Sequence, residues 1–182
     1  MKTKLFILVL ALQSAWLLGT AFTQERALHS GQIILLETQP VYPRDLLRGD
    51  YVTLNYKISN VPTNLFSPAI TGILPAGQTV YVAIVRRGEF YEVVRASTGP
   101  LVAADQEIIL KGRHDSRRWW SPQQNSIHLE YGLERYYVRE GTGNPRGKLT
   151  VQAAVPSSGN AVIKQVFVDG KPYAEAMKDA GR

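Results

Sequence analysis

The chain has 182 residues, a formal net charge of +6 and 45% hydrophobic residues, values typical of one globular domain rather than a disordered chain. It contains no cysteine, which excludes disulfides, thiolate zinc sites, iron–sulfur clusters and a thiol nucleophile. The positive charge favours an anionic neighbour, such as a lipid surface, nucleic acid or an acidic partner domain.

Residues 1–25 are predicted to form a membrane anchor. Leu5 to Phe22 is a nearly uninterrupted apolar run, and about 18 helical residues can just cross a hydrocarbon layer ~30 Å thick. Lys2 and Lys4 precede the run, and no net positive charge follows it. The positive-inside rule therefore predicts a single-pass protein with a cytoplasmic N-terminus and a periplasmic or other extracytoplasmic domain.

A cleaved signal peptide is the alternative interpretation of this segment. Residues 19–21, Gly-Thr-Ala, resemble a small-residue cleavage site. The anchor is preferred because the apolar run is longer than the usual core of a signal peptide and because bulky Phe22 would follow the cut. Both interpretations export the rest of the chain.

Residues 30–175 are predicted to form one domain, followed by a tail at 176–182. Strand-like segments separated by turn residues are expected at 33–39, 50–58, 79–86, 91–96, 107–113, 126–131, 133–138, 149–155 and 161–168. The pairs 79–86 with 91–96 and 149–155 with 161–168 are typical of hairpins. The expected fold is mainly β: one antiparallel domain built as a curled sheet, open barrel or sandwich.

Smaller elements are also expected between and after these strands. The proline- and glycine-containing stretch 59–78 predicts a long loop with a short strand at 69–74. A helical turn is expected at 43–48 and a short helix at 174–179. Within 50–58, alternation assigns Val52, Leu54, Tyr56 and Ile58 to the core and Tyr51 to the opposite face.

One short run carries a family signature: glycine, aspartate, tyrosine, two free positions, leucine, one free position and tyrosine. Residues 49–56 fit it, and similarity continues through 40–48, 131–141 and 168–172. The chain resembles the GDYXXLXY family of bacterial membrane-anchored proteins over nearly all of the expected domain. Members often have an acidic residue where this chain has Tyr42, so no carboxylate role is assigned there.

The resemblance implies a subunit of a membrane complex more than a free enzyme. Members of the family are often associated with polytopic membrane proteins of unknown function, so the resemblance implies a polytopic membrane protein as the expected partner. No cofactor is implied. Site residues are expected in three places. These are the signature, the similar segment 131–141, which we call the second motif, and one basic loop.

The first two groups of candidate residues belong to the motifs and could form one interaction site. From the signature and the residue before it they are Arg48, Gly49, Asp50, Tyr51, Leu54 and Tyr56. From the second motif they are Tyr131, Gly132, Glu134, Arg135, Tyr136, Glu140 and Gly141. Their acids and guanidinium groups could dock a partner or ligand. The alternative is a purely structural role for both groups. Asp50 would then hold a turn, and the second motif would form a bulged strand and loop held by an ion pair.

A basic aromatic loop supplies the third group. Its candidate residues are Arg113, Arg117, Arg118, Trp119 and Trp120. Cations beside indoles suit a phospholipid headgroup layer or an anion, and a tethered domain already stands beside lipid, so membrane or partner contact is preferred to nucleic acid. A solvated rim with one inward tryptophan is the structural alternative.

Evidence for catalysis is weak. The three histidines are too scattered for a metal site, and no nucleophile elbow or phosphate loop occurs. The one enzyme alternative is a Ser/Lys hydrolase, reminiscent of signal peptidases, using Ser59 or Ser67 with Lys111. The sequence therefore predicts a noncatalytic, membrane-anchored accessory subunit or interaction domain.

Overall fold

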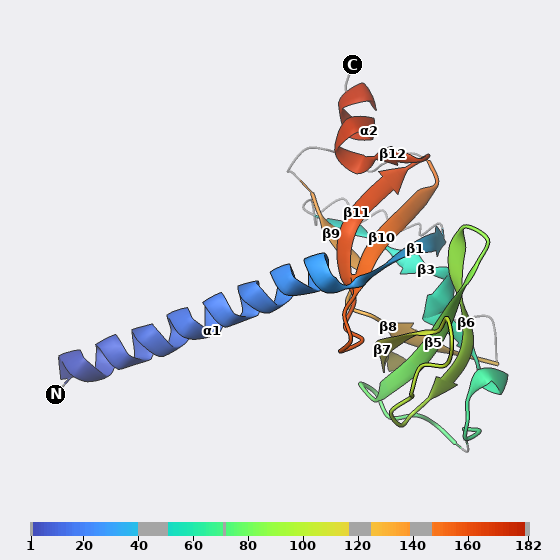
Figure 1. Ribbon diagram of the computed structural model, residues 1–182, viewed down its shortest axis with the longest axis horizontal. Helices are drawn as coiled ribbons and strands as arrows, with labels where there is room; N and C mark the ends of the chain where they lie inside the picture. Colours follow the sequence, from blue (N-terminus) through green and yellow to red (C-terminus); the bar gives the residue numbers. More distant parts are fainter. Residues whose placement is uncertain (1, 40–50, 71, 117–124, 139–146, 181–182) are drawn as a thin grey trace.

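The computed structural model describes residues 2–39, 51–70, 72–116, 125–138 and 147–180. Within these ranges, one long helix projects from a β-rich domain, and strands distant in sequence lie side by side (Figure 1). The prediction of a mainly β protein with one N-terminal apolar helix is confirmed.

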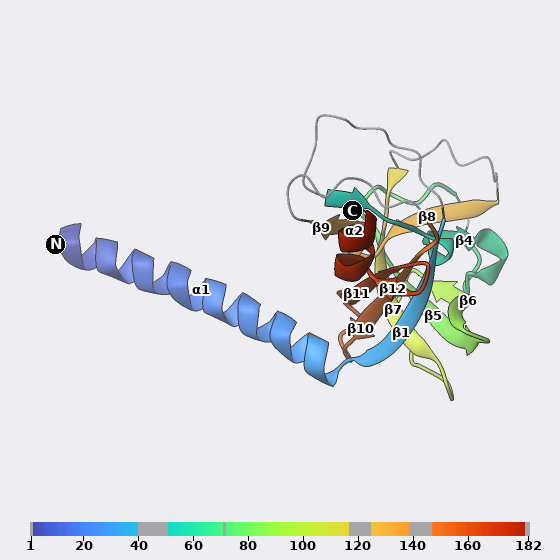
Figure 2. The same ribbon diagram turned by 90° about the horizontal axis from the view of Figure 1, so that it is seen from above.

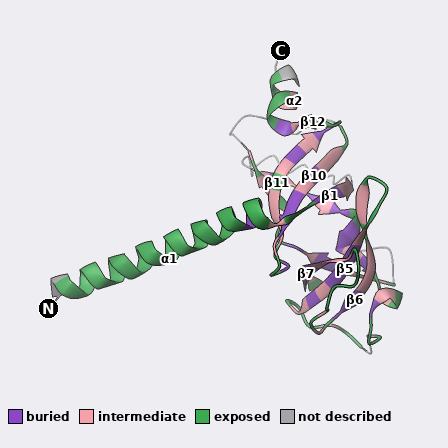
Figure 3. Cartoon of the chain, in the orientation of Figure 1, coloured by how far each residue is buried: buried purple, intermediate pink, exposed green. Residues whose placement is uncertain are grey.

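The helix α1, Lys2–Ser30, runs unbroken through the apolar segment. Its residues from Lys4 to Arg26 are exposed, and the helix is long and apolar enough to cross a membrane (Figure 3). Its last turn joins the domain: Ala27 is buried, and the Gly31 N–H donates to the Ala27 carbonyl at 3.0 Å. A Cβ on Gly31 would lie 2.9 Å from the Val155 nitrogen, so the junction leaves no room for a side chain.

The first sheet has five antiparallel strands in the order β12–β11–β10–β1–β3. They are β1 (Gln32–Gln39), β3 (Asn55–Tyr56), β10 (Leu149–Val155), β11 (Val162–Val168) and β12 (Lys171–Pro172). The predicted hairpin of β10 and β11 is confirmed. The helix α2, Tyr173–Ala180, follows β12 and buries Tyr173.

The second sheet has the order β4–β8–β7–β5–β6. Its strands are β4 (Asn60–Pro62), β5 (Thr79–Arg87), β6 (Phe90–Ser97), β7 (Ile108–His114) and β8 (Ser126–Glu130). The predicted hairpin of β5 and β6 is confirmed. A third sheet is a two-stranded ribbon of β2 (Tyr51–Thr53) and β9 (Arg135–Tyr137). Two 3₁₀ turns, η1 (Lys57–Ser59) and η2 (Thr63–Leu65), flank β4.

One apolar core joins the sheets. It contains alternate residues of β1, such as Ile34 and Leu36, together with Val82 of β5 and Val166 of β11. The predicted core face of 50–58 is confirmed, since Val52, Leu54, Tyr56 and Ile58 are all buried. Burial of this continuous set is the main stabilising contribution, at about 25 cal/mol per Å² of apolar surface.

Residues 51–62 pair with strands of all three sheets in succession. Tyr51–Thr53 pairs with β9, Asn55–Tyr56 pairs with β1, and Asn60–Pro62 pairs with β8. Between the first two pairings, the Leu54 N–H donates to the Glu134 carbonyl at 2.8 Å. The single strand expected at 50–58 is therefore divided, because the segment changes pairing partner while its side chains keep their alternation.

Other local expectations differ from the structure in part. The short strand expected at 69–74 is wrong for its described residues, which form no strand next to Pro68 and Pro75. The strand expected at 133–138 is limited to β9, because Gly132 has a φ of +80° and residues 132–134 bend the chain. The helix expected at 174–179 is present within α2. The turn expected at 43–48 lies outside the described residues.

The helices α1 and α2 both extend across the predicted domain limits. α1 continues to Ser30, five residues beyond the expected end of the anchor at 25. α2 occupies residues 176–180 of the expected tail, with Ala176 and Met177 packed against the core.

Candidate functional site

The two motifs identified in the sequence lie side by side. In the β2–β9 ribbon, Tyr51 is opposite Tyr137, Val52 is opposite Tyr136, and Thr53 is opposite Arg135. These pairs join positions more than 80 residues apart in the chain, and side chains opposite one another on an antiparallel pair are in contact range.

Buried tyrosines hold the motifs together beyond the ribbon. The Tyr56 hydroxyl donates to the Leu133 carbonyl at 2.7 Å, and the Tyr131 hydroxyl donates to the Ile58 carbonyl at 2.8 Å. We call this reciprocal pair the tyrosine clasp. Burial raises the pKa of both phenols above the ordinary value, and the nearby Glu134 carboxylate acts in the same direction. Both hydroxyls therefore remain protonated donors, and neither can serve as a base near neutral pH.

The opposite face of the ribbon carries the half-buried Tyr51 and the exposed Arg135 and Tyr137, which together we call the ribbon patch. The Arg135 guanidinium carbon lies 5.4 Å from the centre of the Tyr51 ring, a cation–π distance. The Tyr51 and Tyr137 rings are tilted at 59° with centroids 6.1 Å apart. Tyr137 is 71% exposed, so the patch offers aromatic surface and a cation to a neighbour.

Two second-motif residues have structural contacts. Glu134 accepts the Tyr131 N–H at 2.6 Å and so closes the bend around Gly132. Tyr136 points away from the ribbon patch and meets the Tyr173 ring edge-on, with centroids 5.4 Å apart. These contacts give Glu134 and Tyr136 a structural role, although neither contact is the ion pair considered from the sequence.

A family model described as GDYXXLXY protein matches residues 13–166, more than half of the chain. The chain belongs to the GDYXXLXY family. No curated protein and no solved structure matches it. The matched range includes the second half of α1 and both motifs.

The structure separates the described GDYXXLXY signature residues by role. Leu54 and Tyr56 are 1% and 0% exposed, so packing and the tyrosine clasp explain their presence. Tyr51 is half-buried beneath Arg135 and has no such role in the core. Tyr51 is therefore the described signature residue best placed to meet another molecule.

Several predicted site residues of this GDYXXLXY protein lie outside the described ranges. They are Arg48, Gly49, Asp50, Glu140, Gly141, Arg117, Arg118, Trp119 and Trp120. Arg113 is described: it is exposed at the end of β7, opposite Thr79 and Glu130.

Among the described residues, no hydrogen bond joins Ser59 or Ser67 to Lys111. The Ser59 hydroxyl is buried without a hydrogen-bond partner, Ser67 is exposed, and the Lys111 Nζ lies 5.7 Å from the Tyr81 ring centre. Within the described part of the chain, no cluster of His, Asp or Glu has the grouping of a metal site. The structure thus supplies no positive support for the hydrolase alternative.

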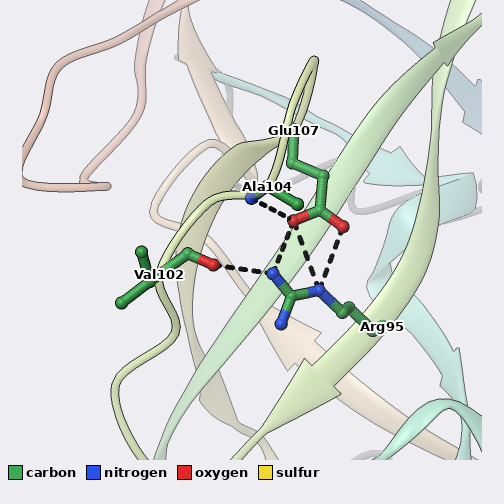
Figure 4. Close-up of polar contacts among 4 residues, drawn as sticks. All are labelled: Arg95, Val102, Ala104 and Glu107. Atoms are coloured by element: carbon green, nitrogen blue, oxygen red, sulfur yellow. Dashed lines mark hydrogen bonds and ion pairs between the residues drawn. The ribbon is translucent and has the colours of Figure 1, made fainter.

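A polar network that sequence reasoning missed fixes the loop between β6 and β7 (Figure 4). The Arg95 Nε donates to Glu107 Oε1 at 3.0 Å, and its Nη2 donates to the Val102 carbonyl at 2.7 Å. Glu107 also accepts the Ala104 N–H at 2.8 Å. Hydrogen bonding to Arg95 lowers the pKa of Glu107 below its ordinary value. No motif marks this pair, because its members are simply opposite charges twelve residues apart.

Glu107 also lines an open depression of about 550 Å³ between β1 and strands β5, β6 and β7. Ile33, Arg86 and Tyr91 contribute to its walls. Because Arg95 already holds the Glu107 carboxylate, this depression has no free acid at that position and suits no acid–base pair.

Tyr137 is not among the predicted site residues, although it is 71% exposed within the ribbon patch. Its spacing of two from Arg135 would have assigned it to the same strand face.

Proposed function

We propose that this GDYXXLXY protein is a noncatalytic accessory subunit, anchored in a bacterial membrane by α1, whose extracytoplasmic domain docks on a polytopic membrane protein through the ribbon patch. The observation that carries the proposal is the position of Tyr51. It belongs to the family signature, yet it lies on the exposed face of the ribbon beside Arg135 and Tyr137.

The anchor part of the proposal rests on the continuity of α1 with the domain. The helix passes without a break through residues 19–21, where a signal peptide would be cut, and continues to Ser30. Its last turn packs on the domain through Ala27. The family match also includes residues 13–30. These features favour an uncleaved helix that remains part of the mature protein.

The location of the ribbon supports docking close to the membrane. Residues 23–30 extend α1 by about 12 Å beyond the apolar run, which is enough to pass through a headgroup layer about 5–8 Å deep. In both Figure 1 and Figure 2, β9 lies on the side of the domain toward which α1 projects. A ribbon on that side would meet the extracytoplasmic loops of an integral membrane protein.

The chemistry of the ribbon patch suits protein recognition. Tyrosine and arginine are the residue types that most often dominate binding energy at interfaces, because both offer large contact areas with polar ends. Arg135 provides several N–H donors for carboxylates or loop carbonyls of a partner. The patch is a surface cluster, which fits docking better than turnover.

Affinity purification of the full-length protein from gently solubilised membranes tests this function. The wild type should recover a polytopic membrane protein, and Arg135→Ala or Tyr51→Ala should reduce its recovery by about tenfold or more, as expected for interface hot spots.

Arg87→Ala is the matched control, because Arg87 is also an exposed strand arginine, but lies on the β5–β6 hairpin. It should leave recovery unchanged. If the wild type recovers no membrane protein, the subunit proposal is wrong. If Arg87→Ala reduces recovery as much as Arg135→Ala, the contact cannot be assigned to the ribbon patch.

A further inference from the structure

The centre of the apolar run contains a side-chain amide, that of Gln13, which no residue in the described part of the chain satisfies. Gln13 and Ser14 lie midway between Leu5 and Phe22, so about 13 Å of helix separates them from either end of the run. That distance is too great for a glutamine side chain to reach the headgroups. If the run spans a bilayer, Gln13 is held at its midplane.

The hydroxyl side chains of α1 show how a polar group can be accommodated within one helix. Thr20 Oγ1 donates to the Leu17 carbonyl at 2.8 Å, and Thr23 Oγ1 donates to the Thr20 carbonyl at 2.8 Å. Ser14 can bond its own helix in the same way. Gln13 has no hydrogen-bond partner among the described residues, and hydrocarbon supplies none for its two donors and its acceptor.

The domain lies over the side of the helix that carries Gln13. Gln13, Thr20 and Ala27 are spaced by seven residues, which places Gln13 and Ala27 within about 40° around the helix. Ala27 is buried against the domain. In Figure 2 the domain lies to one side of the line that continues the α1 axis. The domain therefore overhangs the membrane on the Gln13 side.

This overhang decides between two possible neighbours for Gln13. Two parallel copies meeting through Gln13 would each direct their domain over the other helix, so both domains would compete for the same space. A transmembrane helix that ends in a short extracytoplasmic connection fits beneath the overhang. Helices of polytopic proteins, which are joined by such connections, meet this condition.

Resting on the proposed function, we infer that Gln13 forms an interhelical hydrogen bond at the bilayer midplane with a polar side chain on a transmembrane helix of the polytopic partner, beneath the overhanging domain. Interhelical side-chain hydrogen bonds of this kind are a recognised source of specificity within membranes. The partner would then be held twice, at the midplane by Gln13 and at the surface by the ribbon patch.

Photocrosslinking in native membranes tests the inference. The photoreactive residue p-benzoylphenylalanine replaces Leu10, about 60° from Gln13, and in a matched protein replaces Leu8, about 140° from Gln13 at nearly the same depth. Leu10 should yield an adduct with the polytopic protein that co-purifies, and Leu8 should yield about tenfold less. Gln13→Leu should reduce the Leu10 adduct about tenfold, whereas Gln13→Asn should retain it, as expected for an interhelical hydrogen bond.

The alternatives give different results. An adduct of two copies of this chain would overturn the inference in favour of self-association, and equal yields from Leu8 and Leu10 would show that no face is preferred. Gln13→Leu makes the segment more apolar, so membrane insertion is preserved and loss of the adduct reports the contact. If Arg135→Ala abolishes co-purification but Gln13→Leu changes neither recovery nor adduct, the accessory-subunit function stands and the midplane contact falls.

Discussion

Two buried phenols contribute to stability through single hydrogen bonds to the backbone. Tyr56 is 0% exposed and donates to the Leu133 carbonyl, and Tyr131 is 5% exposed and donates to the Ile58 carbonyl. Removing a buried donor leaves its acceptor unsatisfied, which costs about 1–3 kcal/mol. The tyrosine clasp thus fixes the signature segment against the bend around Gly132, on which the position of the ribbon depends.

Tyr56→Phe and Tyr131→Phe should each lower the free energy of unfolding by about 1–2 kcal/mol. For a chain of this size, the melting temperature should fall by roughly 2–4 °C per kcal/mol. Thermal unfolding of the full-length protein in detergent, followed by circular dichroism, measures the effect. Tyr137→Phe is the control, because that residue is 71% exposed and its substitution should change the melting temperature little. An unchanged melting temperature in both buried variants would show that the hydroxyl bonds contribute nothing.

At the scale of elements, residues 51–62, which begin within the signature, change sheet twice. Alternation in the sequence predicted its core face, because alternation is a local property of an extended chain. It could not predict the change of pairing partner at Leu54, which depends on the Glu134 carbonyl 80 residues away. The β5–β6 and β10–β11 hairpins were predictable for the converse reason, since their turn residues and both strands are adjacent in the chain.

The candidate site was predictable to the same limited degree. The resemblance pointed to both motifs, but it did not predict that Tyr56 is buried whereas the half-buried Tyr51 lies beside the exposed Arg135 and Tyr137. That division depends on the pairing of β2 with β9, a contact between distant parts of the chain. The Arg95–Glu107 network had no sequence signal, because its specificity arises from the path of the loop.

The Arg95–Glu107 pair should make stability depend on pH. The folded-state pKa of Glu107 is lowered by Arg95, so the stabilisation is complete above the unfolded glutamate pKa of about 4.3 and is lost as pH falls through the lower folded value. Glu107→Gln should therefore cost about 1–2 kcal/mol at pH 7, and its difference from the wild type should shrink as the pH falls below about 4. Urea unfolding of the full-length protein in detergent from pH 7 to 3 measures this difference.

Glu92→Gln serves as the control for this pair. Glu92 and Arg87 are 3.7 Å apart and both are more than half exposed, so their contact should contribute less than about 1 kcal/mol. The Ala104 N–H donates a hydrogen bond to Glu107, so its hydrogen should also exchange faster in Glu107→Gln than in Glu92→Gln. A stability difference that stays constant from pH 7 to pH 3 would contradict the ion-pair explanation.

At the scale of the whole molecule, the proposed function depends on the junction between α1 and the domain. Ala27 and Gly31 hold the last helical turn against β10, so in an anchored protein the direction of the helix would set which side of the domain faces the membrane. A flexible linker would leave the ribbon patch free to point anywhere, whereas this junction restricts it. Orientation in the bilayer is therefore the property on which both the ribbon contact and the Gln13 contact depend.

Cysteine labelling can determine that orientation without background, because the chain has no cysteine of its own. Single variants Lys4→Cys and Glu89→Cys place one thiol before the apolar run and one on the exposed β5–β6 turn. A membrane-impermeant maleimide applied to intact spheroplasts should label Glu89→Cys and leave Lys4→Cys unlabelled until lysis, because the lysines before the run are retained in the cytoplasm. The reverse pattern would place the domain in the cytoplasm. Absence of Lys4→Cys label after lysis, in a purified chain that still carries the domain, would mean that the helix is cleaved, and both the anchor and the Gln13 contact would then be abandoned.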